Sequence, residues 1–249
     1  MILALLIGHG KNGQKLKCSG TLIKLDTILT AAHCVVNLRR SIFAEPEAIL
    51  HTPQGRRSIR GKKIFVHQKY HRVDMQYDIA IVKLEESFLP SEASLVTLPN
   101  YHENKEPSYF CQSGLVIGWG NTHIATISDK PKKSYFGQSF RCIQLPVISN
   151  NDCRILRSSV KLESHFCAFP GFNDSGGGCV GDSGGPFICG GVQYGIASLN
   201  FGCGVQGEPT YFTRIDKVLS FINENVASSG MWLLEHKKSH YIILFSSLC

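Results

Sequence analysis

The chain contains one stretch that decides its fold, Gly181-Asp182-Ser183-Gly184-Gly185-Pro186. A serine hydroxyl is a poor nucleophile unless a base removes its proton and donors receive the charge that develops on the substrate. The glycines around Ser183 allow backbone turns that a Cβ would block, so amide N–H groups can converge on one point. The stretch predicts a nucleophile built into an anion-binding turn, although by itself it also fits an ordinary glycine-rich turn.

Two earlier segments supply the partners that such a serine needs. Thr30-Ala31-Ala32-His33-Cys34 places a histidine after small residues and beside a cysteine that can hold it in place. Asp78-Ile79-Ala80-Ile81-Val82-Lys83-Leu84 places a carboxylate at the start of a strand-like run. A lone histidine is more often a surface or core residue, and a lone aspartate before a strand is usually part of a turn. The chain order His, Asp, Ser nevertheless matches one of the orders known for catalytic triads.

With these motifs the chain resembles the chymotrypsin/trypsin family of serine endopeptidases (peptidase family S1), over residues 3–227. The resemblance includes three further segments: Cys18-Ser19-Gly20-Thr21-Leu22-Ile23, Gly118-Trp119-Gly120 and Thr213-Arg214-Ile215. It implies an all-β fold of two six-stranded antiparallel β-barrels, with the active site in the cleft between them and a short C-terminal helix.

The resemblance also divides the chain. A protease domain is expected at residues 1–227, with an N-terminal barrel at about 1–98 and a C-terminal barrel at about 109–227. Residues 228–249 form a tail of unknown role. Short apolar runs separated by Gly, Pro and Asn predict strands throughout, and the apolar spacing from Asp216 to Val226 suits a short amphipathic helix.

The bulk composition agrees with a β-rich globular protein. The chain has 249 residues, 24 of them glycine, with 43% hydrophobic and 18% charged residues, which suits strands joined by tight turns. The net charge of +7 comes from scattered basic pairs, for example Arg56-Arg57. Such pairs usually lie on solvated faces, and binding of acidic substrates or glycans stays open; no nucleic-acid motif is found.

Ten cysteines indicate an oxidising compartment, and because no pair has C-x-x-C spacing, no metal is expected and no cofactor is implied. The resemblance implies four disulfides: Cys18–Cys34, Cys111–Cys189, Cys153–Cys167 and Cys179–Cys203. The family usually carries the first cysteine of the second pair three residues later, where Gly114 stands here. Cys142 and Cys249 are left over, and their pairing stays open.

Both ends of the chain are unusual. The run Met1-Ile2-Leu3-Ala4-Leu5-Leu6-Ile7 is too short for a signal peptide and has neither a basic flank nor a small-residue cleavage site, so it is predicted to be a strand. Near the other end, Tyr241-Ile242-Ile243-Leu244-Phe245 is too short to cross a bilayer, and a disordered or artefactual tail is preferred to an anchor. We expect a secreted, monomeric protein whose signal peptide is not in this chain and which has no membrane partner.

The resemblance assigns a role to each residue of the site. Ser183 attacks the scissile carbonyl, His33 acts as general base and then general acid, and Asp78 fixes and stabilises the imidazole. The backbone N–H groups of Gly181 and Ser183 form the oxyanion hole. In the family, the aspartate at Asp182 forms an ion pair with an α-amino group that zymogen cleavage releases.

No segment like the family's Ile-Val-Gly-Gly start precedes Cys18 in this chain. Asp182 is therefore expected to lack a cation, and because a buried unpaired carboxylate is costly, its turn would rearrange into a zymogen-like form. The sequence hypothesis is an inactive chain with intact catalytic residues, explained by a truncated or wrongly assigned start.

Four residues are predicted to shape the substrate pocket. Gly177 stands at its floor, where trypsins carry an aspartate that binds Arg or Lys. Asn200 and Thr210 stand at wall positions where elastases also carry larger residues, and Ser198 and Asn200 would lie along the substrate backbone. Leu199 replaces the tryptophan of the usual Ser-Trp-Gly. The pocket is expected to be constricted and to prefer small or medium uncharged side chains over Arg and Lys.

The sequence thus predicts a secreted serine endopeptidase that acts on proteins or peptides, with a protein inhibitor as a further potential partner. The main alternative is a catalytically silent binding protein with the same fold. An intracellular hydrolase is disfavoured, because it would not explain the cysteine content. The substrate, the activating protease and occupancy of the sequon Asn173-Asp174-Ser175 stay open.

Overall fold

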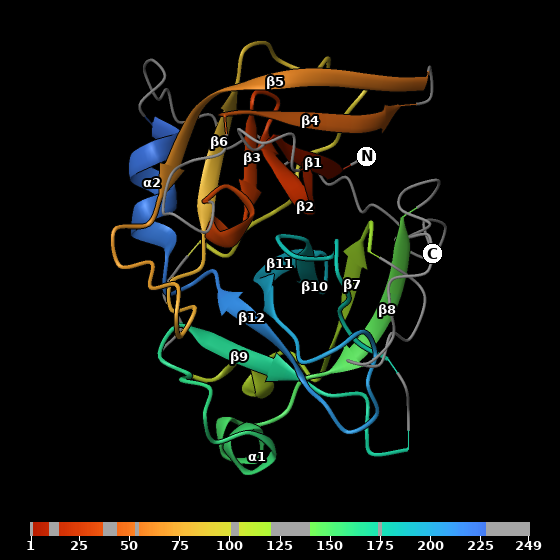
Figure 1. Ribbon diagram of the computed structural model, residues 1–249, viewed down its shortest axis with the longest axis vertical. Helices are drawn as coiled ribbons and strands as arrows, with labels where there is room; N and C mark the ends of the chain where they lie inside the picture. Colours follow the sequence, from red (N-terminus) through yellow and green to blue (C-terminus); the bar gives the residue numbers. More distant parts are fainter. Residues whose placement is uncertain are drawn as a thin grey trace.

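The computed structural model describes residues 2–9, 15–36, 44–52, 55–100, 105–120, 140–173 and 176–227. Its strands form two units, one above the other in Figure 1, with β1–β6 in the upper unit and β7–β12 in the lower. The predicted all-β class and pair of six-stranded antiparallel barrels are confirmed. The tail, residues 228–249, lies outside the described residues, as do Asp174 and Ser175 of the sequon.

The first unit is a closed antiparallel barrel in the order β1-β2-β3-β6-β5-β4. Its strands are β1 Leu3–His9, β2 Lys15–Lys24, β3 Thr27–Thr30, β4 Ala44–Thr52, β5 Gly55–Val66 and β6 Ala80–Leu84. The last residue of β3, Thr30, pairs with the first residue of β6, Ala80. This register brings the chain after β3, which carries His33 in the 3-10 turn Ala32–Cys34, beside the chain before β6, which carries Asp78.

The second unit is a six-stranded antiparallel sheet in the order β8-β7-β10-β11-β12-β9. Its strands are β7 Ser113–Gly118, β8 Arg141–Pro146, β9 His165–Ala168, β10 Pro186–Cys189, β11 Val192–Leu199 and β12 Thr210–Arg214. A bridge between Val147 and Ala168 and a hydrogen bond from Phe169 N to Pro146 O join its two outer strands, β8 and β9. The turn that contains Ser183 leads directly into β10.

The core of the second barrel explains a departure from the family pattern. The rings of Phe166, Phe187 and Phe212 pack together with centroids 4.9–5.3 Å apart. A Cβ on Gly114 would overlap the Phe187 ring. Position 114 therefore has no room for a side chain, and the cysteine bonded to Cys189 is Cys111 instead.

The first strand joins the two barrels. Ala4 and Leu6 point into the core of the first barrel, whereas Leu3 and Leu5 pack with Trp119 against the second. This alternation is the two-residue period of a strand that is buried on both faces. The interpretation of this apolar run as a strand is therefore correct.

Helices occur at three further places in the described residues. They are the 3-10 turn Pro107–Tyr109, α1 Asn150–Leu156 and α2 Leu219–Ala227. In α2, Leu219, Ile222 and Val226 pack into the core of the first barrel, as the predicted amphipathic helix requires. None of the helices in the described part of the chain has the length and apolar character needed to cross a membrane.

The structure contains the four disulfides that the resemblance implies, Cys18–Cys34, Cys111–Cys189, Cys153–Cys167 and Cys179–Cys203. Cys142, left over in the sequence, is also disulfide-bonded. Cys249 lies outside the described residues.

Candidate active site

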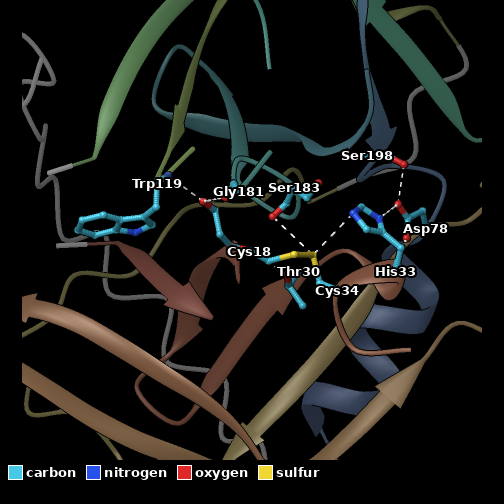
Figure 2. The surroundings of a disulfide bond; sticks show 10 residues. Cys18, Thr30, His33, Cys34, Asp78, Trp119, Gly181, Ser183 and Ser198 are labelled. Atoms are coloured by element: carbon cyan, nitrogen blue, oxygen red, sulfur yellow. Dashed lines mark hydrogen bonds and ion pairs between the residues drawn. A yellow bond between two sulfur atoms is a disulfide. The ribbon is translucent and has the colours of Figure 1, made fainter. Parts of the chain in front are cut away.

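His33 and Asp78 form a tightly held pair at the edge of the first barrel. His33 Nδ1 lies 2.7 Å from Asp78 Oδ2, and the backbone N–H of His33 donates to Oδ1 at 2.9 Å. Asp78 is completely buried, whereas 23% of the His33 side chain is exposed. The carboxylate accepts a third bond from the hydroxyl of Ser198, at 2.6 Å. Backbone and side chain of His33 are thus bound to the same carboxylate, which fixes the imidazole with Nε2 directed away from Asp78 (Figure 2).

His33 and Asp78 each stabilise the charged form of the other. Burial opposes the charged form of each group, but the charge and hydrogen bond of Asp78 outweigh it and raise the pKa of His33. For Asp78 the desolvation is outweighed by the charge and hydrogen bonds of His33, with Ser198 as a further donor, and its pKa is lowered. Asp78 therefore stays ionised at neutral pH, and His33 is a base tuned above the ordinary histidine value.

Ser183 and His33 open into the same cavity. The cavity has a volume of about 200 Å³ and is lined by residues of both barrels: Leu16, Lys17, Cys18, His33, Val180, Gly181, Ser183, Ser198, Leu199 and Asn200. Among the described residues, no hydrogen bond joins Ser183 Oγ to His33 Nε2. Such contacts are often long in the absence of a substrate and tighten when one binds.

The turn around Ser183 has two unused donors. The N–H groups of Asp182, Gly184 and Gly185 bind backbone carbonyls, whereas those of Gly181 and Ser183 have no acceptor among the described residues. Gly181 has a φ of +105°, which an L-residue with a Cβ rarely adopts. Both residues line the cavity that His33 also lines.

Ser19 of the first barrel holds this turn in place. Its hydroxyl donates to Gly181 O at 2.8 Å and accepts from Trp119 N at 3.1 Å, and its backbone N–H donates to Ser183 O at 2.8 Å. Figure 2 shows Trp119, Gly181 and Ser183 near the Cys18–Cys34 disulfide, whose Cys18 directly precedes Ser19 in the chain. The turn is therefore bonded to both barrels.

Asp182 does not line the cavity, and its carboxylate accepts two backbone hydrogen bonds, from Gly120 N at 2.8 Å and from Cys179 N at 2.9 Å. A Cβ on Gly118 or Gly120 would overlap it. Burial raises the pKa of Asp182, and the two hydrogen bonds offset part of that effect. Within the residues that the structure describes, no cation pairs with this carboxylate.

The same motifs match a known family model. The model named Trypsin aligns with residues 4–222. The chain belongs to the trypsin family of serine proteases.

Curated relatives agree with this assignment. The chain is 31% identical over 221 residues to Trypsin-4 of Rattus norvegicus, covering 88% of this chain and 83% of that protein. It is 30% identical over 217 residues to Trypsin-3 of Salmo salar, covering 85% and 84%. It is 29% identical over 214 residues to Trypsin of Squalus acanthias, covering 85% and 86%.

Close contacts join the residues that were predicted to shape the substrate pocket. Thr210 Oγ1 accepts a hydrogen bond from Gly178 N at 2.9 Å, which fixes the threonine side chain beside Gly177 and Gly178. A Cβ on Gly177 would lie 3.0 Å from that oxygen, and one on Gly178 would lie 3.3 Å from Asn200 Nδ2. Leu199 and Asn200 line the cavity, whereas Gly177 and Thr210 do not. Of the four predicted pocket residues, Ser198 and Asn200 thus line the cavity, whereas Thr210 packs beside Gly177 outside its lining.

A cluster of potential metal ligands adjoins the cavity. Atoms of Cys18, His33 and Cys34 lie close enough together to surround an ion. The two sulfur atoms are bonded to each other, however, at 2.03 Å. A disulfide sulfur has no thiolate to offer a metal, so the cluster braces the histidine segment of this trypsin-family chain.

Several residues that contact the site were not predicted from the sequence motifs. Ser198, predicted only as a substrate contact, also donates to Asp78, and Thr213 Oγ1 donates to the backbone carbonyl of Asp78 at 3.1 Å. His165 and Gln76 lie behind Ser198 and are almost completely buried. The only signal for His165 in the sequence is a histidine within an otherwise apolar strand, His165–Ala168, which does not reveal its neighbours.

Proposed function

We propose that this chain is a serine-type endopeptidase that cleaves peptide bonds through His33, Asp78 and Ser183. The observation that carries the proposal is the shared cavity, into which the Ser183 segment and the Asp78-bound imidazole of His33 both open. A base and a hydroxyl with adjacent free N–H donors are the parts that acyl transfer needs.

In this proposal the proton path follows from the hydrogen bonds. Asp78 keeps the His33 proton on Nδ1, so Nε2 is free to take the proton of Ser183 as Oγ attacks the scissile carbonyl. The N–H groups of Gly181 and Ser183 receive the oxyanion. His33 then returns the proton to the leaving amine, and water cleaves the acyl-enzyme by the same route.

A preference for small or medium uncharged side chains next to the cleaved bond is part of this proposal. It is supported by Asn200 and Thr210 at the predicted wall positions, with Thr210 held by its hydrogen bond from Gly178 N, and by the absence of a carboxylate at Gly177 to pair with Arg or Lys. We expect Ala and Val esters to be cleaved faster than the matching Arg ester. Faster cleavage of the Arg ester would contradict this specificity.

Replacement of Thr210 tests the role of this wall position directly. Thr210→Gly should raise kcat/KM for Phe relative to Ala substrates by roughly 10–100-fold, because each methylene accommodated changes discrimination by that order. Thr210→Ser is the matched control, since it keeps the hydroxyl that binds Gly178 N and removes only a methyl group. An unchanged Phe/Ala ratio in Thr210→Gly would show that another element closes the pocket.

A silent or zymogen-like protein is the second candidate, and Asp182 favours it. Its buried carboxylate is satisfied by backbone N–H groups alone among the described residues, and burying a carboxylate without a cation is costly. In this alternative the catalytic residues are present but the Ser183 turn is not held in a productive form.

Stoichiometric labelling separates the two candidates. A fluorophosphonate probe should label one site per chain, at Ser183, and Ser183→Ala should prevent labelling. An activated ester should give a burst of one equivalent of product. Absence of both the label and the burst in the folded wild-type protein would reject the endopeptidase proposal and support the silent or zymogen-like form.

The setting of this activity is proposed to be extracellular, with a protein or peptide as substrate and a protein inhibitor as a further partner. The disulfides in both barrels support an oxidising compartment. A monomer would suffice, because residues of one chain line the whole cavity.

A further inference from the structure

A buried histidine lies directly behind the candidate active site. His165, on β9 of the second barrel, has no exposed surface and does not line the cavity. Its Nε2 lies 3.2 Å from Ser198 Oγ, which in turn donates to Asp78 Oδ2 at 2.6 Å. Only one residue, Ser198, therefore separates His165 from the carboxylate that binds His33.

Backbone groups determine which way the amide of Gln76 is oriented. The N–H of Ser164 can only donate, and it lies 3.1 Å from Gln76 Oε1. The carbonyl of Lys161 can only accept, and it lies 2.8 Å from Gln76 Nε2. The amide oxygen and nitrogen of Gln76 are thus assigned without ambiguity.

This orientation in turn fixes the protonation of His165. Gln76 Nε2, a donor, lies 3.2 Å from His165 Nδ1, so Nδ1 must accept. Nε2 then carries the proton and donates to Ser198 Oγ. The single proton of Ser198 is used on the ionised Asp78, so its oxygen is free to accept from His165. Every donor in the series Gln76, His165, Ser198, Asp78 faces an acceptor.

We propose that His165 is a positioning residue for the reaction: its Nε2–H aims the Ser198 hydroxyl at Asp78, and this holds the carboxylate in line with His33. The inference rests on the proposed function, because it concerns the geometry of the same Asp78–His33 pair. His165 does not line the cavity itself, and it acts through Ser198, which does.

The surroundings keep His165 in the neutral state that this role needs. Burial outweighs the opposing charges of Asp78 and Asp74 and lowers the pKa of His165 to about 4. The other polar groups that face it are neutral: Gln76, Ser164 and Ser198. The imidazole therefore remains a neutral Nε2–H donor wherever Asp78 and His33 form their pair.

The connection also ties the two barrels together at the catalytic pair. Gln76 and Asp78 precede β6 of the first barrel, whereas His165 and Ser198 lie on β9 and β11 of the second. Two positive-φ residues, Met75 and Tyr77, flank Gln76. Such conformations are retained where the surroundings compensate them, and here the compensation includes the burial of the Gln76 amide against His165.

Two variants of His165 test the proposal. His165→Phe keeps a planar ring but has no hydrogen-bond donor. It should lower kcat roughly tenfold and change KM by no more than about twofold, because the Ser198 hydroxyl is no longer aligned with the Asp78 carboxylate. The acid limb of the pH profile should move down toward the ordinary histidine value. His165→Gln can present an amide N–H near the position of Nε2, and it should retain kcat within about threefold of wild type.

A direct measurement does not depend on activity. In protein labelled with 15N-histidine, NMR at neutral pH should show His165 as the neutral Nε2–H tautomer; the Nδ1–H tautomer or an imidazolium would overturn the proposal. An active wild type with an unaltered kcat and acid limb in His165→Phe would also overturn it, as would equal impairment of His165→Gln. A wild type that the fluorophosphonate does not label contradicts the proposed function instead, and the tautomer still decides this inference.

Discussion

Asp78→Asn is expected to lower kcat/KM by about 10⁴-fold while the protein stays folded, a magnitude taken from Ser-His-Asp triads of other proteases. The reason lies in the three donors that face the carboxylate. The backbone N–H of His33 can only donate, so the oxygen of the introduced amide must remain at the Oδ1 position. The amide nitrogen then faces His33 Nδ1 and Ser198 Oγ, both of which are donors to Asp78 in the native protein.

The substitution should therefore reverse the tautomer of His33. With an amide N–H opposite it, Nδ1 accepts and the imidazole proton moves to Nε2, which can no longer take the proton of Ser183. The pKa of His33, which Asp78 raises, should also fall. Because a base works only in its neutral form, activity of the wild type is lost as the pH falls through the raised pKa, and this acid limb should lie at lower pH in the variant.

The measurement is the rate of ester hydrolysis or of fluorophosphonate labelling as a function of pH. Asp152→Asn is the control: Asp152 is exposed in α1, where its carboxylate accepts from Ser149 Oγ at 2.6 Å, and it contacts neither His33 nor Asp78. Its labelling rate should stay within about threefold of wild type, because an exposed carboxylate outside the site contributes little. A loss in Asp78→Asn no larger than that of the control would remove Asp78 from the mechanism.

Gly184→Ala should cause the largest loss of stability among single-methyl additions near the site. Gly184 follows Ser183 with a φ of +80°, and a Cβ there would overlap Thr30 Oγ1 and the backbone carbonyl of Ser19. The carbonyl cannot move without breaking the contacts by which Ser19 holds the turn. We expect a destabilisation of about 4 kcal/mol or more, and a fall in Tm of about 10 °C or more.

Gly191→Ala separates the clash from the backbone strain. Gly191 has nearly the same φ, +82°, but nothing lies within 4 Å of a Cβ built there. Gly191→Ala should lower the free energy of unfolding only by the cost of a left-handed conformation, about 1–2 kcal/mol. Thermal unfolding of the two variants gives the comparison. If both variants lost the same amount of stability, the loss in Gly184→Ala would come from backbone strain alone. The contact between the Ser183 turn and the first barrel would then contribute little to stability.

The fold and family of this protein were predictable from its sequence because the deciding signals are local. The serine that lies among glycines able to adopt a positive φ is a short-range feature, and so is the order of the cysteines. The two barrels that bring these segments together were predicted from the resemblance to the family. The strand near the N-terminus was predicted because its apolar run is unlike a signal peptide, and the helix near Val226 because of its helical periodicity. The catalytic roles of His33, Asp78 and Ser183 stay predictions, although His33 and Ser183 open into one cavity and Asp78 binds His33.

The local sequence thus determined which residue types and turns are available: the glycines of the Ser183 turn, the absence of an acid at Gly177, and the cysteines. The tertiary structure alone decided which residues line the cavity, the contacts by which Ser19 holds the Ser183 turn, and the hydrogen-bonded series from Gln76 through His165 and Ser198 to Asp78. Where the Ser19 contacts and the series cross from one barrel to the other, they join residues that are 85 or more positions apart. The geometry of these contacts depends on the strand register and on how the two barrels pack. A short sequence segment contains only one of the two partners in each contact, so it does not reveal that geometry.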